Sequence, residues 1–342
     1  GEVIGGGVTT GTLIAFLTYT RHFFEPIEEL AHWFAEMQMA QASAERIISL
    51  IEAESDIQDS AAVKEKMAVP HGMGFAPDGH ADDIQRVELE NVRFSYAVGG
   101  EVLKGINLSI AKGENIAIVG STGSGKTSLV NLLCRFYEPT GGRILIDGID
   151  YRERSLKWLQ SNLGIVLQSS HIFGGSIADN ISYGKRDAKR EDIIAAAKKS
   201  GAHSFISQID GGYDSQVGKA GARLSAGEKQ LISFARAILA DPAILVMDEA
   251  TSSVDTVTEQ EIQRGLSELL QGRISLVIAH RLSTIRQADR ILVLEHGEVI
   301  ESGNHAALMA KRGRYYFLYS QQRLDEFSGE QSSWSQEEII TP

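Results

Sequence analysis

The sequence predicts an α/β fold built on a largely parallel, doubly wound sheet. From about residue 85 onward, short apolar runs alternate with helical stretches, and strands interleaved with helices are typical of this arrangement. The apolar runs are Ile116–Val119, Ile144–Ile146, Ile165–Leu167, Ile244–Met247, Leu276–Ile278 and Ile291–Leu294. Residues 87–110 alternate in polarity instead, which predicts an antiparallel β region beside the main sheet.

Composition and charge exclude several classes of protein. The 342 residues allow two to three domains at about 100–200 residues each, and the 43% hydrophobic content supplies a core. The 33 basic and 45 acidic residues give a net charge of −12, the wrong sign for a protein that coats nucleic acid. A single cysteine, Cys134, excludes an internal disulfide framework and a Cys-based zinc cluster. Composition alone therefore predicts a mostly soluble, intracellular chain.

Residues 3–24 carry few charges, and the stretch is about as long as a helix that crosses a bilayer. No charged residue lies between Val3 and Tyr19, and glycines and threonines are frequent. Small residues and threonines suit a helix packed against other membrane helices, although a buried helix of a soluble domain is the alternative. A signal peptide would need a basic region and a small-residue cleavage site, and the stretch has neither. We favour the membrane helix.

Beyond Pro26 the pattern becomes that of a long amphipathic helix. Between Leu30 and Ile51 the apolar residues follow a three-four spacing, with glutamates on the other positions. Residues 53–85 are poor in large apolar side chains and rich in Ser, Asp, Gly and His, which predicts a linker. Because one membrane helix cannot form a pathway, we expect the chain to be the C-terminal part of a longer protein.

Residues 120–127 match the P-loop pattern Gly-x-x-x-x-Gly-Lys-Ser/Thr. They follow a predicted strand, Asn115–Val119, and open a predicted helix, Thr127–Cys134, which is the context that the motif requires. Such a loop turns its backbone N–H groups and the helix N-terminus toward phosphate, while the lysine contacts the β- and γ-phosphates and the threonine binds Mg²⁺. The candidate nucleotide-binding residues are Gly120, Ser121, Thr122, Gly123, Ser124, Gly125, Lys126, Thr127 and Ser128.

A second candidate site feature is a buried run that ends in two carboxylates, Asp248 and Glu249. Alone, such a strand end is as often solvated as functional, but this one follows a complete P-loop on the same predicted sheet. Asp248 is placed to hold Mg²⁺ through water. Glu249 points elsewhere and is the candidate general base that polarises an attacking water.

Residues 224–228, Leu-Ser-Ala-Gly-Glu, precede a predicted helix, Lys229–Leu239, and resemble the signature Leu-Ser-Gly-Gly-Gln of the ATP-binding cassette (ABC) family. The order of motifs along residues 1–325 resembles that family as well. Residues 172–181 and the helix ahead of the nucleotide domain resemble its exporter branch.

The resemblance implies roles for single residues. Tyr96 would stack on adenine, and Gln168 would touch Mg²⁺ and the membrane domain. Asp255 would lie in the D-loop, and His280 would contact the γ-phosphate, although a lone histidine at a strand end is more often structural. Across the dimer interface, ATP would meet the signature of the second chain, formed by Ser225, Ala226, Gly227 and Glu228.

The resemblance also implies the domain organisation and the partners. Residues 1–52 would be the last transmembrane helix and its cytoplasmic extension, and residues 53–85 the linker. Residues 86–325 would be the nucleotide-binding domain, with a parallel core, an antiparallel β subdomain and a helical subdomain, followed by a flexible tail at 326–342. The expected ligands are ATP and Mg²⁺, and the expected partner is a second half-transporter in the cell membrane, with the nucleotide domain in the cytoplasm. The transported substrate stays unknown, and no nucleic-acid partner is expected.

The signature departs from the family pattern at Ala226 and Glu228. A carboxylate at 228 would disfavour a γ-phosphate nearby, and Lys219 stands where exporters often have Glu. Because Lys126 and Glu249 are intact, we favour a heterodimer with one consensus and one degenerate ATP site. A homodimer, with the altered signature as ordinary family variation, is the alternative.

Two rival functions fit part of the pattern. A soluble cassette ATPase acting on nucleic acid is disfavoured by the net charge of −12 and by the apolar stretch at residues 3–24. A regulatory cassette that binds ATP without hydrolysing it is disfavoured by the intact Glu249 and His280. We therefore expect an exporter ATPase, in which water activated by Glu249 attacks the γ-phosphate in line.

Overall fold

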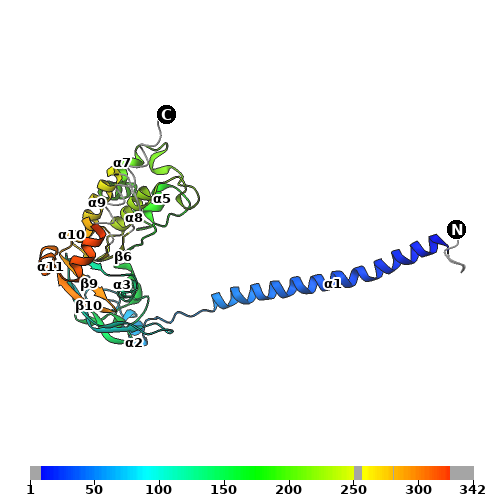
Figure 1. Cartoon of the computed structure of the whole chain (residues 1–342), viewed down its shortest axis with the longest axis horizontal. Helices are drawn as coiled ribbons and strands as arrows, with labels where there is room; N and C mark the ends of the chain where they lie inside the picture. The colour runs from blue at the N-terminus through cyan, green and yellow to red at the C-terminus, as the bar shows by residue number, and fades with distance from the viewer. Residues whose placement is uncertain (1–8, 250–255, 280, 324–342) are drawn as a thin grey trace. The chain divides into compact units, whose positions relative to one another are not determined.

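The structure is a computed structural model that describes residues 9–249, 256–279 and 281–323 (Figure 1). The chain divides into two compact units, Gly1–Asp56 and Ile57–Pro342. Two of the residues predicted for the site, Asp255 and His280, lie outside the described residues, as does the predicted tail at 326–342.

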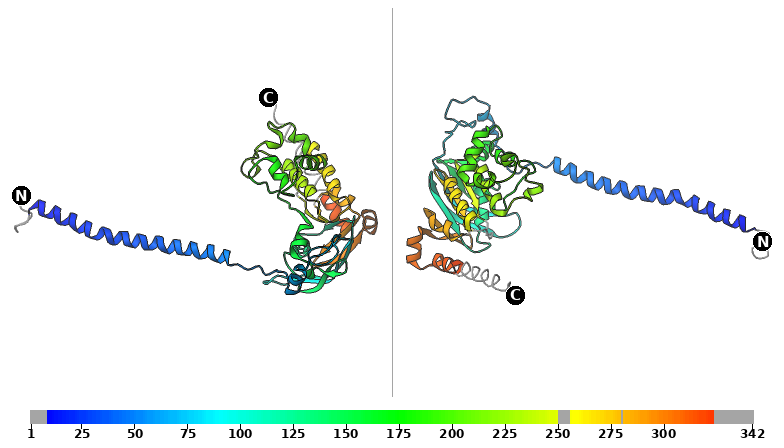
Figure 2. Two further views of the ribbon diagram at one scale, coloured as in Figure 1. Left: turned by 180° about the vertical axis from the view of Figure 1, so that it is seen from behind. Right: turned by 90° about the horizontal axis from the view of Figure 1, so that it is seen from above.

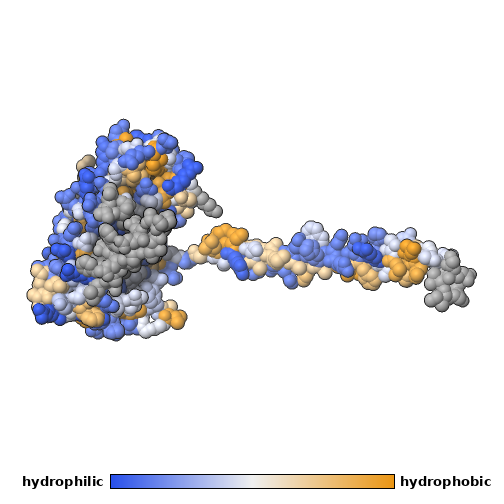
Figure 3. Space-filling model, turned by 45° about the horizontal axis from the view of Figure 1, so that its top comes forward, coloured by the Kyte–Doolittle hydropathy of each residue, from blue (hydrophilic) through white to orange (hydrophobic). Residues whose placement is uncertain are grey.

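The first unit is a single long helix, α1 (Thr10–Ile51), which confirms the continuous N-terminal helix. Thr9 caps it by accepting a hydrogen bond from the amide of Thr12 at 3.2 Å, and Pro26 lies within it. None of its residues is buried, and Figure 3 shows apolar side chains on its surface toward both ends. Within the described residues, no helix combines the length and the apolar character needed to cross a membrane.

The second unit is built on a six-stranded sheet, in the order β10-β9-β3-β8-β7-β6. All neighbouring pairs are parallel except β9 and β10, which confirms the predicted parallel core. The strands are β3 (Asn115–Val119), β6 (Leu163–Val166), β7 (Ile244–Asp248), β8 (Ile274–Ile278), β9 (Arg290–Glu295) and β10 (Glu298–Gly303).

A second, antiparallel sheet has the order β2-β1-β4-β5 and confirms the predicted antiparallel region. Its strands are β1 (Arg86–Ser95), β2 (Glu101–Ala111), β4 (Gly141–Ile146) and β5 (Ile149–Asp150). The apolar run Ile144–Ile146, which we expected among the strands of the main sheet, belongs here, because β4 pairs with β1. Gly142, at φ 75°, permits this pairing: a Cβ there would lie 2.3 Å from the carbonyl oxygen of Asn91.

The helices cover the sheets and form a separate helical region. In Figures 1 and 2, α5, α7 and α8 gather at one end of the second unit, away from α2 and α3. The helices are α2 (Ala61–Met67), α3 (Lys126–Leu133), α4 (Leu156–Ser161), α5 (Ile177–Ser182), α6 (Arg190–Ser200), α7 (Ala202–Ile206), α8 (Ala226–Ala240), α9 (Thr256–Leu270), α10 (Leu282–Gln287) and α11 (His305–Lys311). Short 3₁₀ turns occur at Tyr151–Glu153, Gly212–Asp214 and Lys219–Gly221.

Two clusters of buried side chains lie on opposite faces of the six-stranded sheet. Successive residues of β3 alternate between them: Ile116 and Ile118 join one cluster, and Ala117 and Val119 join the other. Cys134 is fully buried in the first of these, and burial raises the pKa of its thiol to about 12, so it packs as a small apolar side chain.

Residues 53–85, which we expected as a linker, contain α2 and one partner of a buried ion pair. The carboxylate of Asp78 accepts hydrogen bonds from Nε of Arg154 at 3.1 Å and from the amide of Ser155 at 2.7 Å. The Arg154 guanidinium also lies over the ring of Trp158, 3.5 Å from its centre. Burial would raise the pKa of Asp78, but the amide donors and the charge of Arg154 outweigh this effect and hold the pKa below its usual range.

Two more hydrogen bonds attach the same segment to α4. The amide of Leu156 donates to Asp59 at 2.8 Å, and the indole N–H of Trp158 donates to Asp82 at 2.5 Å. The segment from Asp59 to Ile84 is therefore fixed to the start of α4, which leads directly into β6.

We expect Asp78→Asn to lower the free energy of unfolding by about 3–5 kcal/mol, because it leaves the charge of Arg154 buried without a partner. Since the pKa of Asp78 is lowered in the folded state, its contribution is present above about pH 4 and is lost as the pH falls through the folded-state pKa. Urea unfolding followed by tryptophan fluorescence measures this loss. Asp214→Asn, in the exposed pair with Arg190, is the matched control and should cost less than about 1 kcal/mol; equal losses in the two variants would contradict the assignment.

Candidate functional site

The parallel strands bring the predicted site residues to one edge of the sheet. Ile118 of β3 pairs with Ile278 of β8, which in turn pairs with Asp248 of β7. The carboxyl ends of these strands are therefore level, and the P-loop and Glu249 follow them directly. Gln168 is exposed and comes two residues after β6, the neighbour of β7. In open α/β sheets ligands bind at this edge.

The P-loop, residues 120–127, has the curled backbone that the motif predicts. The amide of Ser124 donates to the carbonyl oxygen of Ser121 at 3.2 Å, and Gly125 opens α3 at φ 105°. A Cβ on Gly120 would lie only 2.2 Å from the carbonyl oxygen of Leu294, so only glycine fits at this position. The close approach of the loop to β9 fixes the start of the P-loop.

Lys126 and Ser124 each place a polar group within the loop. Nζ of Lys126 donates to the carbonyl oxygens of Gly120 at 2.8 Å and Ser121 at 2.9 Å. Burial lowers the pKa of Lys126, and the nearby charge of Asp248 partly offsets this effect. Within the described residues, the buried hydroxyl of Ser124 has no hydrogen-bond partner. A curled loop with an ammonium group and an unpartnered hydroxyl fits a phosphate group.

Two side chains at the same edge have the oxygen donors that Mg²⁺ prefers. Thr127 is exposed in the first turn of α3, and Asp248 is partly exposed at the end of β7. Mg²⁺ is commonly held by one or two protein carboxylates together with phosphates of the substrate, so this donor set fits the ion. Gln168 follows the neighbouring strand.

Tyr96 lies one residue beyond β1 and contacts the P-loop helix. Its hydroxyl is 3.0 Å from the hydroxyl of Ser128 on α3, and its ring lies 4.7 Å from Phe94 and 5.2 Å from Tyr137 in edge-to-face geometry. Tyr137 is 43% exposed. It was not among the residues expected from the sequence, and no motif marks it; only the fold brings the two tyrosines together.

Glu249 is buried, with 2% of its surface exposed. One carboxylate oxygen accepts a hydrogen bond from the amide of Arg281 at 3.0 Å, and the other accepts one from the hydroxyl of Thr284 at 2.7 Å. The amide of Glu249 donates to the carbonyl oxygen of Ile278 at 3.1 Å. Sequence reasoning missed Arg281 and Thr284, although both closely follow the predicted His280.

The residues of the altered signature form a capping box at the start of α8. The amide of Glu228 donates to the hydroxyl of Ser225 at 3.2 Å, and the amide of Ser225 donates to the Glu228 carboxylate at 2.7 Å. Ala226 is the first residue of α8, and Gly227 is buried. Among the hydrogen bonds described for residues 225–228, none reaches the P-loop.

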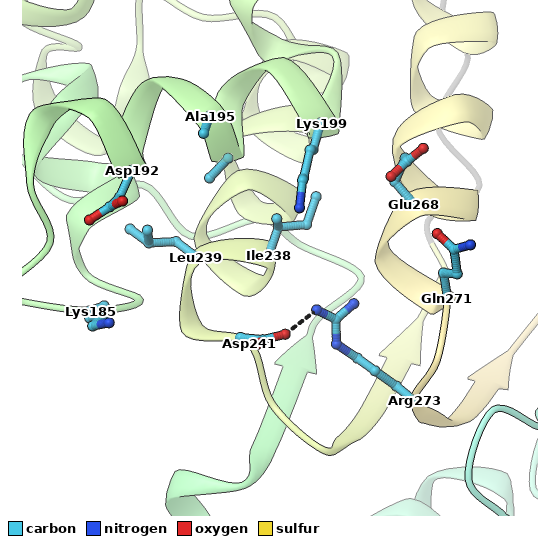
Figure 4. Close-up of a pocket in the computed structure, with 11 residues that line it drawn as sticks. Lys185, Asp192, Ala195, Lys199, Ile238, Leu239, Asp241, Glu268, Gln271 and Arg273 are labelled. Atoms are coloured by element: carbon cyan, nitrogen blue, oxygen red, sulfur yellow. Dashed lines mark hydrogen bonds and ion pairs between the residues drawn. The ribbon is translucent and has the colours of Figure 1, made fainter.

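A small cavity of about 190 Å³ lies beside the P-loop. Its lining residues come from β3, the P-loop, the end of β8 and the C-terminal stretch: Val119, Gly120, Lys126, Ala279, Leu318, Gln321 and Gln322. A larger cavity of about 410 Å³ lies between α6, α8 and α9, where Asp241 pairs with Arg273 at 2.7 Å (Figure 4). None of the residues predicted for the site lines this larger cavity.

Residues 103–252 match the family model described as ABC transporter, and this stretch contains the P-loop, Gln168, the signature and both carboxylates. The chain contains the ATP-binding domain of an ABC transporter. The ABC domain binds ATP.

Similar proteins extend the match to nearly the whole chain. An ATP-dependent lipid A-core flippase of Syntrophus aciditrophicus is 43% identical over 96% of this chain and 52% of its own length. A fatty acid ABC transporter ATP-binding/permease protein of Mycobacterium bovis is 44% identical over 92% of this chain and 47% of its own length. The structure of a bacterial Atm1-family ABC exporter with ATP bound has 36% identity and a TM-score of 0.70, over 94% of this chain and 54% of that one. The chain thus spans about half the length of the relatives it matches.

Two substitutions separate phosphate contacts from base contacts. We expect Lys126→Ala to weaken binding of both ATP and inorganic tripolyphosphate by about 10- to 100-fold, because the phosphates lose a charged donor. Tyr96→Ala should weaken ATP binding alone, since stacking on a base is worth about 1–3 kcal/mol. Isothermal titration with the two ligands measures the difference.

Tyr96→Phe is the matched control, because it keeps the ring and removes only the hydroxyl contact with Ser128. It should bind ATP within about threefold of wild type. If Tyr96→Ala weakened the two ligands equally, the tyrosine would support the P-loop rather than the base.

Proposed function

We propose that this chain is the C-terminal part of an exporter-type ABC half-transporter that couples ATP hydrolysis to transport across a membrane. The observation that carries the ATPase is the meeting of the P-loop, Asp248 and Glu249 at one edge of the parallel sheet. The similarity to flippase and permease proteins about twice as long supports the transport role. Of the substrate we propose only that it crosses the membrane through the transmembrane part of the transporter.

The proposed domain limits follow the sequence. Residues 1–52 would be the last transmembrane helix with its cytoplasmic extension, joined by residues 53–85 to a nucleotide-binding domain at 86–325. The apolar side chains exposed along α1, among them Phe16, Phe23 and Trp33, support a role in packing against other helices. The nucleotide-binding domain would then lie on the cytoplasmic side.

In the proposed reaction, the P-loop amides and Lys126 hold the phosphates of ATP, while Tyr96 contacts the base. Glu249 accepts a proton from water, whose oxygen attacks the γ-phosphorus in line as the bond to ADP breaks. His280 would contact the transferred phosphoryl group. Mg²⁺, held by Thr127, Asp248 and Gln168, would supply charge neutralisation on the phosphates.

A groove of about 420 Å³ beside Gln168 supports coupling to a membrane domain. It runs along β6, α5 and α8, and exposed apolar residues, including Leu167 and Tyr183, line it. At its side, the Arg236 guanidinium lies 5.9 Å from the ring of Tyr183 and donates to the carbonyl oxygen of Asn180 at 3.0 Å. We propose that a membrane-domain segment docks in this groove.

We further propose that two half-transporters pair, so that each ATP lies between the P-loop of one chain and the signature of the other. The altered residues Ala226 and Glu228 favour a heterodimer with one degenerate site. The capping box supports the homodimer instead. It directs the Glu228 carboxylate to the amide of Ser225, and the glutamine of the family signature would make the same contact.

If Glu249 is the general base, Glu249→Gln should lower ATP turnover by about 10²- to 10⁴-fold while ATP still binds. Turnover is measured on the full-length protein in lipid vesicles, and binding is measured by titration with ATP. Glu268→Gln on α9, which lines the cavity of Figure 4, is the control and should leave turnover unchanged. Near-normal ATP turnover of the Glu249→Gln variant would contradict the assignment of Glu249 as the general base.

The asymmetric pairing is tested by purifying the full-length protein with and without its genetic neighbour. In a heterodimer, Glu249→Gln in this chain alone should abolish nearly all ATP hydrolysis. The double change Ala226→Gly and Glu228→Gln should then alter turnover by less than about twofold, because only the degenerate site carries the altered signature. Robust hydrolysis by this chain alone would instead establish the homodimer.

A further inference from the structure

The side chain of Glu249 is held by two donors that no motif identifies. Thr284 is 2% exposed, and its hydroxyl donates to one carboxylate oxygen at 2.7 Å, while the Arg281 amide donates to the other at 3.0 Å. Because each oxygen has its own donor, the plane of the carboxylate is set from both sides. We refer to Arg281 and Thr284 as the Glu249 clasp.

The clasp belongs to a rigid part of the fold. Thr284 lies in the first turn of α10, which the amide of Ile285 closes by donating to the carbonyl oxygen of Arg281 at 3.2 Å. Ile285 and Ala288 are buried in the core cluster that includes Val277 of β8. Movement of the Thr284 backbone would therefore require α10 to shift against the sheet, so the position from which the hydroxyl reaches the carboxylate is fixed.

The charges around the clasp favour the same orientation. Nε of Arg281 lies 3.7 Å from the carboxylate of Glu249, and its guanidinium also pairs with Glu259 on α9. Arg281 is thereby held between two carboxylates on different elements and positions its own amide. Its Nη2 is buried and has no hydrogen-bond partner within the described residues.

We propose that Thr284 is a positioning residue for Glu249: its hydroxyl orients the carboxylate that activates the attacking water. This inference rests on the proposed ATPase function. A carboxylate oxygen has lone pairs for a second hydrogen bond, so the clasp leaves Glu249 able to accept a proton from water. Without the hydroxyl, the carboxylate can rotate away from the water, and small errors in placing a catalytic group cost up to about 100-fold in rate.

The test compares Thr284→Val, which keeps the shape and removes the hydroxyl, with Thr284→Ser, which keeps the hydroxyl. On the full-length protein in vesicles, Thr284→Val should lower kcat by about 10- to 100-fold, with KM and the Kd for ATP within about twofold. Thr284→Ser should restore most of kcat. Thr140→Val is the matched control, because Thr140 is exposed and its hydroxyl donates only to the carbonyl oxygen of Arg93.

A double-mutant cycle separates positioning from a general structural role. In the Glu249→Gln background, where residual turnover is followed with radiolabelled ATP, Thr284→Val should reduce the rate by less than about twofold, since the group it orients is already gone. A reduction as large as in wild type, an increase in kcat for Thr284→Val, or loss of ATP binding would each overturn the proposal. Near-normal turnover of Glu249→Gln alone would instead overturn the proposed function, so the two failures are distinguishable.

Discussion

The parallel register of β3, β8 and β7 is the constraint on which the candidate site depends. It makes three strands end level, so that the P-loop, Asp248 and Glu249 meet although more than a hundred residues separate the first from the others. Gly120 adds a second constraint. The P-loop can start this close to β9 only because residue 120 has no side chain. A slip of one residue in any of these strands would turn the next side chain to the opposite face of the sheet.

The carboxylate of Glu228 in the signature can act electrostatically in two ways. As a free charge facing a triphosphate, Glu228 would be repulsive. Folded back on the first turn of α8, it complements the positive end of the helix and satisfies an amide that would otherwise lack a partner. Both the helix cap and the proposed composite ATP site use Ser225. Whether repulsion or capping dominates in the assembled protein therefore depends on whether nucleotide binding competes for that residue.

The parts of the site that could be predicted from the sequence are those coded by adjacent residues. The P-loop combines a strand, a glycine-rich turn and a helix start within a single stretch, so its backbone follows from local chemistry. The partner of β4 could not be predicted, because an apolar run of three residues suits either sheet. Tyr137, Thr284 and Asp78 were missed for a related reason: each contacts a residue 35 to 77 positions away, such as Glu249 for Thr284 and Ser155 for Asp78.

The attachment of residues 59–84 to α4 changes how force could pass between the two units. Asp59 lies near the start of the second unit, and its carboxylate accepts a hydrogen bond from the amide of Leu156 in α4. Residues 52–58 lie between the end of α1 and Asp59, a span of at most about 25 Å when fully extended. Because Asp59 and Asp82 both accept hydrogen bonds from α4, tension along this segment would act on α4 and on β6, the strand that precedes Gln168, before it reaches the start of β1.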